Sequence, residues 1–296
     1  MSQPWILVSP ASRGIGHALT RHLLRTSTAP ILATARTDLP GVRASLLDSL
    51  HASSPSSPDV ENNIASAPHR LHVARLDVTS EPTLRAAAAE AARLFPPATH
   101  HLRHAFALPG VLRPERRPRD VDYADALRTL GVNVVGPLLL MKWFGAFLPR
   151  RGTGGCGGSV FAAEEDEEGE GEGGGKRDGD GDGRATWLTA SARVGSTADN
   201  RLGGWYTYRA SKAAVNSLTK TFDLHLQTQS GDRAMAIAYH PGTVRTGLSR
   251  EFWDRVEEDK LFSPEYAAER MVQVVRTRAL ADRGRCWDWK GEEVPP

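Results

Sequence analysis

Cysteine and long apolar runs are the two features that this sequence has little of. Its 296 residues include only Cys156 and Cys286, which lie far apart with no Cys/His ligand spacing around either. This excludes a disulfide framework and a zinc site, and we expect two ordinary thiols and no bound metal. No apolar run approaches the ~18 residues that span a bilayer, and the run that begins at Trp5 is too short for a signal peptide. We therefore expect a cytoplasmic protein with no membrane partner.

The sequence also has little net charge, because its formal charge is only +2. The segment Glu164–Asp182, however, holds ten acidic residues against Lys176 and Arg177, a local charge of −8, so the rest of the chain carries +10. A basic body is compatible with a nucleic acid or with a phosphate-rich cofactor. The basic residues are scattered and form no basic helix or aromatic-interleaved patch, so we expect no nucleic-acid partner.

Apolar runs alternate with helical patterns along most of the chain, which predicts an α/β fold: a doubly wound, Rossmann-type, mostly parallel sheet of seven strands in one domain, 1–296. With 40% apolar residues a chain of this length can bury one sizeable core. The predicted strands are 5–9, 29–35, 71–79, 104–108, 185–190, 234–240 and 285–289. The main predicted helices begin after Gly14 and cover 81–95, 121–147 (broken at Gly136-Pro137), 208–218 and 263–275.

Two segments interrupt this pattern. Residues 151–184 are rich in Gly, Glu and Asp and lack apolar anchors, which predicts a disordered insertion. An acidic interaction tail or a metal-binding run is the alternative, although no calcium-loop spacing fits. Residues 52–67 begin with a Ser/Pro-rich stretch and are predicted to be a surface loop.

The first predicted strand leads directly into a glycine turn and an amphipathic helix, which is the order typical of nucleotide binding. Gly14 and Gly16 would let the backbone approach a pyrophosphate at the helix N-terminus. The second strand ends at Arg36, twenty residues after Gly16, where such folds recognise the adenosine ribose. Arg36 and Arg13 there favour a 2′-phosphate; Asp38 is the competitor, since a carboxylate would bind the ribose hydroxyls of NAD.

Tyr208 and Lys212 form the candidate catalytic pair. Four residues apart on a predicted helix, they project from one face, so that the ammonium can lower the pKa of the phenol. Such a pair suits proton exchange with an alcohol or carbonyl oxygen. Ser191, at the end of the strand before it, could hold the same oxygen. An exposed tyrosine and lysine at this spacing by chance is the alternative.

The segment Ser191–Lys212 resembles the active-site segment of short-chain dehydrogenase/reductases, and Ser191–Ser196 followed by Asp199–Tyr206 is similar to the C-factor-like branch of that family. The resemblance implies catalytic roles for Asn133, Ser191, Tyr208 and Lys212. It implies that the cofactor, NADP(H), contacts Ser12, Arg13, Gly14, Ile15, Gly16, Arg36, Asp77, Gly110, Asn133, Tyr208, Lys212, Pro241, Gly242, Val244 and Thr246. For Asp77 a plain turn or cap is the alternative, and for Asn133 a structural polar tie.

Two departures from the family pattern affect these assignments. Ser9-Pro10 replaces Thr-Gly in the glycine loop, and Pro109-Gly110 follows the fourth strand where Asn-Asn-Ala-Gly is usual.

Leu248–Phe262 is predicted to be a substrate lid, or else a surface helix with buried aromatics. The resemblance implies reduction of an aldehyde or ketone, or the reverse reaction. We expect a small-molecule substrate, and a homo-oligomer is a further expectation. An NAD-dependent alcohol oxidase and a cofactor-sensing or signalling protein are the rivals.

Overall fold

The computed structural model describes residues 1–50, 57–153, 159–161 and 183–296 of the chain. Its centre is an eight-stranded sheet in the order β10-β9-β6-β5-β4-β1-β2-β3, and all neighbouring strands are parallel except β9 and β10. The strands are β1 Gln3–Ser9, β2 Ile31–Ala35, β3 Leu71–Arg75, β4 His100–Ala107, β5 Ala185–Ala190, β6 Ala234–His240, β9 Cys286–Asp288 and β10 Glu293–Val294. A separate two-stranded pair consists of β7 Thr243–Val244 and β8 Leu261–Phe262. The predicted doubly wound fold is confirmed, with eight strands in the main sheet in place of seven.

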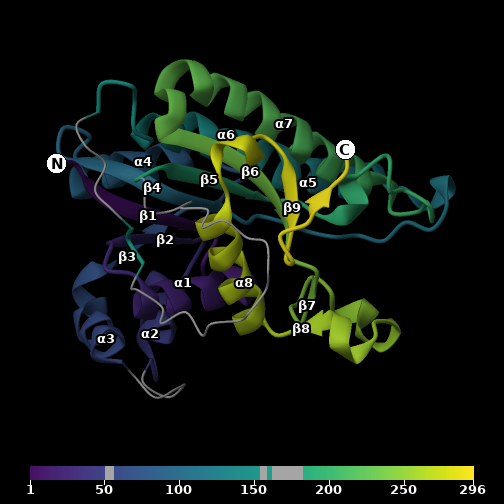
Figure 1. The fold of residues 1–296 in the computed structure, drawn as a ribbon. Helices are drawn as coiled ribbons and strands as arrows, with labels where there is room; N and C mark the ends of the chain where they lie inside the picture. Colours follow the sequence, from purple (N-terminus) through teal and green to yellow (C-terminus); the bar gives the residue numbers. More distant parts are fainter. Residues whose placement is uncertain (51–56, 154–158, 162–182) are drawn as a thin grey trace, which may run out of the picture.

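Helices cover both faces of this sheet (Figure 1). They are α1 Gly14–Thr26, α2 Leu39–Leu47, α3 Pro58–Arg70, α4 Glu81–Leu94, α5 Tyr123–Leu130, α6 Gly136–Phe144, α7 Tyr206–Ser230 and α8 Pro264–Thr277. Short 3-10 helices occupy Pro118–Asp120, Gly145–Phe147, Arg193–Gly195, Gly231–Arg233, Arg250–Arg255, Glu258–Lys260 and Leu280–Asp282. Helices α1, α2, α3 and α8 lie below the sheet in Figure 1, and α4 to α7 lie above it.

The two faces follow from the period-2 alternation along the strands. In β1, Ile6 and Val8 belong to a core cluster shared with α1 and α8, whereas Trp5 and Leu7 belong to a second cluster shared with α4 and α6. All four side chains are fully buried. A strand buried on both faces has to be apolar throughout, and the sequence of β1 meets that requirement.

A continuous helical stretch, Tyr123–Phe147, is long and apolar enough to cross a membrane by length and composition. The expectation that no apolar run approaches this length was wrong for this stretch. In the fold, Leu140, Met141 and Phe144 of this stretch are buried in the second core cluster, against the sheet. Its predicted break is a π-helical turn, Gly131–Val135, directly before Gly136 and Pro137. Such a turn accommodates a proline, which lacks the N–H of a regular helix position.

The prediction of a surface loop over 52–67 is wrong for its second half, because residues from Pro58 onwards form α3. Ser57 caps this helix by accepting a hydrogen bond from Val60 N, and Pro58 stands in its first turn. The buried side chains of Ile64 and Ala67 pack in the first core cluster. A serine cap, a proline at the start and an apolar face outweigh the loop-like composition. Residues 51–56 lie outside the described part of the chain.

The predicted insertion at 151–184 also requires a correction. Val160 and Phe161 are buried in the first core cluster, and Phe161 stacks on His104 with ring centroids 5.2 Å apart. Arg184 is buried as well, directly before β5. The statement that the whole segment lacks apolar anchors is therefore wrong at these positions. Residues 154–158 and 162–182 lie outside the described residues, and so does Cys156.

Candidate active site

A cavity of about 760 Å³ opens at the carboxyl end of the sheet. Its walls come from the loops after β1, β4 and β6 and from the 3-10 segment that begins at Arg250. Because β1 lies between β4 and β2 in the sheet order, this is the point where the strand order reverses. Ligands of open α/β sheets bind at this kind of crevice. Of the predicted cofactor residues, Arg13, Gly14, Ile15, Gly16, Gly110, Pro241 and Thr246 line it.

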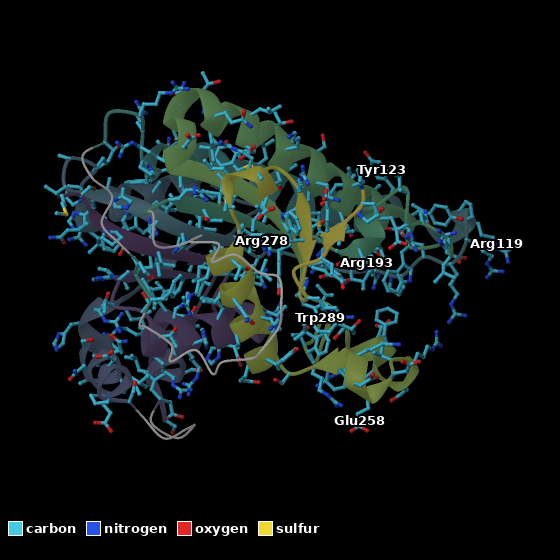
Figure 2. All side chains as sticks on the ribbon, viewed as in Figure 1. Arg119, Tyr123, Arg193, Glu258, Arg278 and Trp289 are labelled. Atoms are coloured by element: carbon cyan, nitrogen blue, oxygen red, sulfur yellow. The ribbon has the colours of Figure 1, made fainter. Side chains whose placement is uncertain are left out.

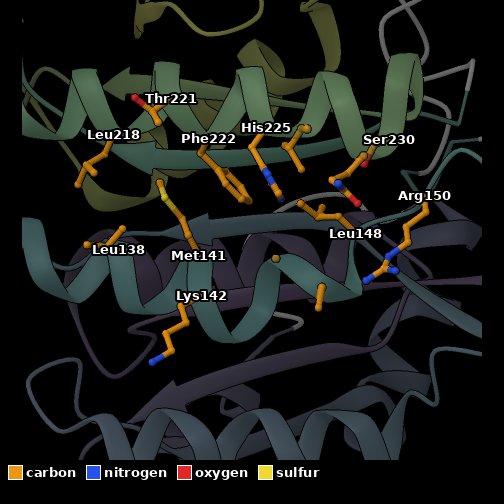
Figure 3. A pocket seen from close by; sticks show the side chains of 14 residues that line it. Leu138, Met141, Lys142, Leu148, Arg150, Leu218, Thr221, Phe222, His225 and Ser230 are labelled. Atoms are coloured by element: carbon orange, nitrogen blue, oxygen red, sulfur yellow. The ribbon is translucent and has the colours of Figure 1, made fainter.

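A second cavity, of about 520 Å³, lies between α6 and α7 (Figure 3). Its lining includes Met141, Leu148, Phe222 and His225 but none of the predicted site residues. The cavity at the carboxyl end of the sheet is therefore the candidate active site.

Tyr208 and Lys212 lie on the buried side of α7, as the spacing predicts. Both side chains are buried, and the Lys212 ammonium lies 5.7 Å from the centroid of the Tyr208 ring. Lys212 Nζ donates a hydrogen bond to Ala190 O at 2.8 Å, and a Cβ at position 110 would lie 3.9 Å from the same Nζ. Ala190 and Gly110 both line the cavity. The pair therefore stands directly behind the cavity wall and is not part of its lining.

The expected effect of the ammonium on the phenol is not what the structure gives. Burial raises the pKa of Tyr208 above its usual range, and burial also lowers the pKa of Lys212 to about 8. Loss of hydration disfavours the charged form of both groups, and the ammonium lies over the ring. The phenol is consequently protonated at neutral pH, which suits a proton donor.

Ser191 follows β5 and is held by α7. Its hydroxyl donates a hydrogen bond to Asn216 Oδ1 at 2.6 Å and makes a longer one to Lys212 O at 3.5 Å. Asn216 was missed by sequence reasoning, although it lies four residues after Lys212 and so on the same face of the helix. The arrangement fixes the Ser191 hydroxyl beside the catalytic pair.

Asn133 is fully buried in the π-helical turn, and its side chain is fully engaged. Oδ1 accepts from Val111 N at 2.8 Å, while Nδ2 donates to Val111 O at 2.9 Å and to Ser211 Oγ at 3.0 Å. These bonds form the structural tie that the sequence left open as the alternative, and the catalytic role of Asn133 stays a prediction. They anchor the loop directly after Gly110, the glycine that the usual asparagines would precede, and connect that loop to α7.

The glycine loop has the close packing that nucleotide binding requires. Gly14 has a left-handed φ of 57°, and a Cβ at Gly16 would lie 1.9 Å from Pro10 O, so only glycine fits there. No side chain caps the N-terminus of α1, and Ser12 and Arg13 beside it are exposed. A Cβ on Gly14 would lie 3.2 Å from a methyl carbon of Thr246, so the loops after β1 and β6 meet here. The uncapped N–H groups of α1, the glycine backbone that a ligand can approach closely and the Arg13 side chain fit a pyrophosphate.

Arg36 and Asp38 are the two candidates for contact with the adenosine ribose of the cofactor. β2 ends at Ala35, so Arg36 is the first residue of the loop, and its side chain is exposed. Asp38 is the N-cap of α2, where its Oδ1 accepts from Gly41 N at 3.1 Å. Neither residue lines the cavity itself. Because the Asp38 carboxylate is engaged as a cap, the geometry favours Arg36 over Asp38 at the ribose position.

Asp77 forms a turn of its own. Its Oδ1 accepts from Thr79 N at 2.9 Å and from Thr79 Oγ1 at 2.7 Å. The backbone bond is the main reason why the pKa of Asp77 is lowered, and nearby Arg36 contributes a smaller lowering. The turn matches the alternative that the sequence left open. Asp77 does not line the cavity, and its contact with the cofactor stays a prediction.

The segment after β6 carries the remaining predicted residues. Gly242 has a φ of 74° and packs against Phe262, while Val244 is buried in β7 and its carbonyl accepts from Ser249 Oγ at 2.5 Å. Neither Gly242 nor Val244 lines the cavity. Both residues belong to the Pro241–Thr246 turn and pack outside the cavity lining.

Leu248–Phe262 is built from two short 3-10 helices and β8. Glu258 lies at the far end of this segment, with Trp289 between it and the sheet (Figure 2). The Phe252 ring packs on Trp205 with centroids 4.9 Å apart, and Trp205 contacts Tyr208 edge-on at 6.0 Å. Leu248, Phe252 and Trp253 line the cavity. The predicted lid therefore does border the site, through an aromatic chain that reaches Tyr208.

No group of three or more His, Cys, Asp or Glu side chains that could hold a metal ion occurs within the described ranges. Cys286 is a free, buried thiol. Burial raises its pKa to about 12. It is therefore an inert thiol at neutral pH.

No protein-family model matches the chain. C-signal of Myxococcus xanthus is 28% identical over 176 residues, which cover 60% of this chain and 81% of that protein. A 1-hydroxy-2-glutathionyl-2-methyl-3-butene dehydrogenase of a Rhodococcus species is 36% identical over 95 residues, 32% of this chain and 39% of that enzyme.

Solved structures share the fold over the whole chain. An NADPH-bound carbonyl reductase from chicken fatty liver has a TM-score of 0.71 at 22% identity, and the carbonyl reductase Sniffer of Drosophila melanogaster has a TM-score of 0.71 at 20% identity. Each match covers all of both chains. A short-chain dehydrogenase/reductase from Burkholderia multivorans with bound NADP has a TM-score of 0.64 at 22% identity and covers 99% of this chain and all of that chain. The predicted resemblance to this family, including its C-factor-like branch, is confirmed.

Proposed function

We propose that this chain, which resembles short-chain dehydrogenase/reductases in sequence and in fold, is an NADP(H)-dependent oxidoreductase that reduces an aldehyde or ketone to an alcohol. The observation that carries the proposal is the buried pair Tyr208 and Lys212, held beside Ser191 directly behind the wall of the cavity. Three such groups at one point are what proton transfer to a carbonyl oxygen requires. Relatives and structural neighbours that are oxidoreductases support the same reaction class.

When bound, NADPH supplies the hydride that reduces the carbonyl carbon. Arg13, Gly14, Ile15 and Gly16 at the N-terminus of α1 hold its pyrophosphate, and Thr246 closes this part of the cavity. These residues bind and orient the cofactor and leave the proton chemistry to α7.

Tyr208 donates the proton that the carbonyl oxygen needs. Burial raises the pKa of Tyr208, so the phenol holds this proton at neutral pH. Ser191 orients the oxygen by donating its single hydroxyl proton to it, and Asn216 Oδ1 accepts this proton at 2.6 Å until the substrate is bound. Lys212, whose ammonium lies over the ring, stabilises the phenolate that forms after the transfer.

In the reverse reaction Tyr208 would accept the proton as a phenolate, and burial disfavours this form. Oxidation of an alcohol should therefore need a higher pH than reduction of a carbonyl, and an NAD-dependent alcohol oxidase stays the alternative.

The test is NADPH consumption by the purified protein across a panel of aldehydes, ketones and quinones. We expect turnover of at least one member, its loss in Tyr208→Phe with cofactor binding retained, and loss of both turnover and binding affinity in Lys212→Ala. Tyr206→Phe is the matched control, because Tyr206 lies in the same helical turn with an exposed side chain and should keep full activity. Turnover in Tyr208→Phe above a few per cent of wild type would contradict the role of Tyr208.

The second candidate is a cofactor-sensing or signalling protein with little turnover, and the similarity to C-signal favours it. NADPH binding without consumption of any panel member would support this candidate. The substrate in either case is a small molecule, while a homo-oligomer and a cytoplasmic location stay predictions.

A further inference from the structure

Glu115, on the loop between β4 and α5, reaches the start of the helix that carries Tyr208. Its side chain is only 6% exposed. Glu115 Oε2 accepts a hydrogen bond from Thr207 N at 3.0 Å, and Oε1 accepts one from the Thr207 hydroxyl. Its backbone carbonyl accepts a third, from Trp205 N at 2.6 Å. All three bonds end within the three residues that precede Tyr208.

The turn that Glu115 holds is not stable by itself. Trp205 has a left-handed φ of 52°, which costs a non-glycine residue about 1–2 kcal/mol. As the N-cap of α7 it provides no side-chain hydrogen bond to the helix. The carboxylate of Glu115 takes the place of the missing cap and puts a negative charge at the positive end of a 25-residue helix.

The loop that carries Glu115 is itself fixed. Asn133 makes two hydrogen bonds to the backbone of Val111, which lies four residues before Glu115 in the chain. The same loop passes Lys212 at Gly110. Glu115 therefore ties the first turn of α7 to the part of the fold against which Lys212 is placed.

We propose that Glu115 is a positioning residue that fixes Tyr208 relative to Ser191 and Lys212. This inference rests on the proposed function, since it concerns the same site. Without the carboxylate, Thr207 N loses its acceptor, and the strained turn at Trp205 keeps only its backbone bond. The Trp205 ring, which contacts both Tyr208 and Phe252, moves with this turn. The distance from the Tyr208 hydroxyl to a substrate oxygen is then no longer fixed.

The experiment compares Glu115→Ala, Glu115→Gln and Thr207→Val with a matched control, Ser57→Ala. Ser57 also caps a helix, α3, by accepting from Val60 N, and no residue of α3 lines the cavity. We expect kcat to fall at least tenfold in Glu115→Ala with KM for NADPH unchanged. Glu115→Gln should recover part of the loss, because the amide oxygen can still accept one bond. Ser57→Ala should lose stability and keep kcat.

A second readout does not depend on turnover. In protein carrying ¹³C-labelled tyrosine, the Tyr208 resonance should shift in Glu115→Ala and, to a smaller extent, in Thr207→Val, and stay in place in Ser57→Ala. Thr207→Val removes a single hydroxyl, so it tests the contact even if Glu115→Ala fails to fold. The losses of kcat in Glu115→Gln and Thr207→Val should be less than additive in the double variant.

The inference is overturned if the Tyr208 resonance and kcat of the folded Glu115 and Thr207 variants match those of the wild type, or if Ser57→Ala lowers kcat to the same extent. Absence of turnover in the wild type would overturn the proposed function instead, and the resonance would still decide the role of Glu115.

Discussion

Replacing Arg36 with alanine should remove most of a preference for NADPH over NADH. Arg36 follows the last residue of β2, and Arg13 lies on the glycine loop; both side chains are exposed. A charge-assisted hydrogen bond to a 2′-phosphate contributes about 1.5–3 kcal/mol, and exposure places both arginines at the lower end of that range. Each is then equivalent to about tenfold in kcat/KM, so the wild type should prefer NADPH by about 10². Arg36→Ala should reduce this ratio to about tenfold, measured as kcat/KM with both cofactors.

Asp38 provides the control for this reasoning. Its carboxylate caps α2 through Gly41 N, so Asp38→Asn, which keeps an acceptor oxygen, should leave the cofactor ratio unchanged. A combined Ala35→Asp and Arg36→Ala variant should invert the ratio, because it adds a ribose-binding carboxylate and repels the phosphate. Equal kcat/KM values in the wild type, or an NADH preference that Asp38→Asn abolishes, would refute the assignment and transfer the ribose contact to Asp38.

Four further perturbations test the site and the fold. Asn216→Ala should lower kcat several-fold, because the Ser191 hydroxyl loses the acceptor at 2.6 Å, a bond of about 1 kcal/mol, and the loss should vanish in a Ser191→Ala background. Replacing residues 162–182 by a Gly-Ser linker of half that length should hardly change Tm, since halving a loop alters its closure free energy by ~0.6 kcal/mol. Deleting 157–183 removes the buried Val160 and Phe161 and should destabilise the fold by about 3 kcal/mol or more; equal Tm values for the two deletions would contradict their core role. Burial lowers the pKa of His101 to about 4, so the unfolded state binds an extra proton between about pH 6.5 and pH 4 and the free energy of unfolding should fall as pH falls through that window, by at most ~1.4 kcal/mol per pH unit. Urea unfolding at several pH values should show a smaller fall for His101→Gln than for the wild type, and identical slopes would contradict this assignment.

Much of the fold was predictable because β1, β2, β5 and β6 are buried on both faces and are therefore largely apolar. β1, β2, β5 and β6 fall where the sequence predicts them, to within two residues at either end. β10 was not predictable, since Glu293 and Val294 give no strand pattern and their pairing with β9 depends on a turn at Gly291. The helix at Pro58 was missed because its serine and proline residues resemble a loop in composition but act as a cap and a first turn.

The catalytic pair was predictable because a spacing of four residues on a helix fixes a shared face. Its ionisation was not, since the pKa of Tyr208 depends on how much water folding removes from the phenol. Asn216 and Glu115 act through contacts between distant parts of the chain. Glu115 lies 92 residues before Thr207, and no local pattern marks such a contact.

Transfer of deuterium from NADPH that carries two deuterium atoms at the reactive carbon of its nicotinamide ring tests the central claim most directly. With a carbonyl compound that the protein turns over, mass spectrometry of the product alcohol should show one deuterium on the former carbonyl carbon in the wild type. Tyr208→Phe should form no labelled alcohol while still binding NADPH. An unlabelled alcohol in the wild type, or labelled alcohol formed at the wild-type rate by Tyr208→Phe, would contradict the account.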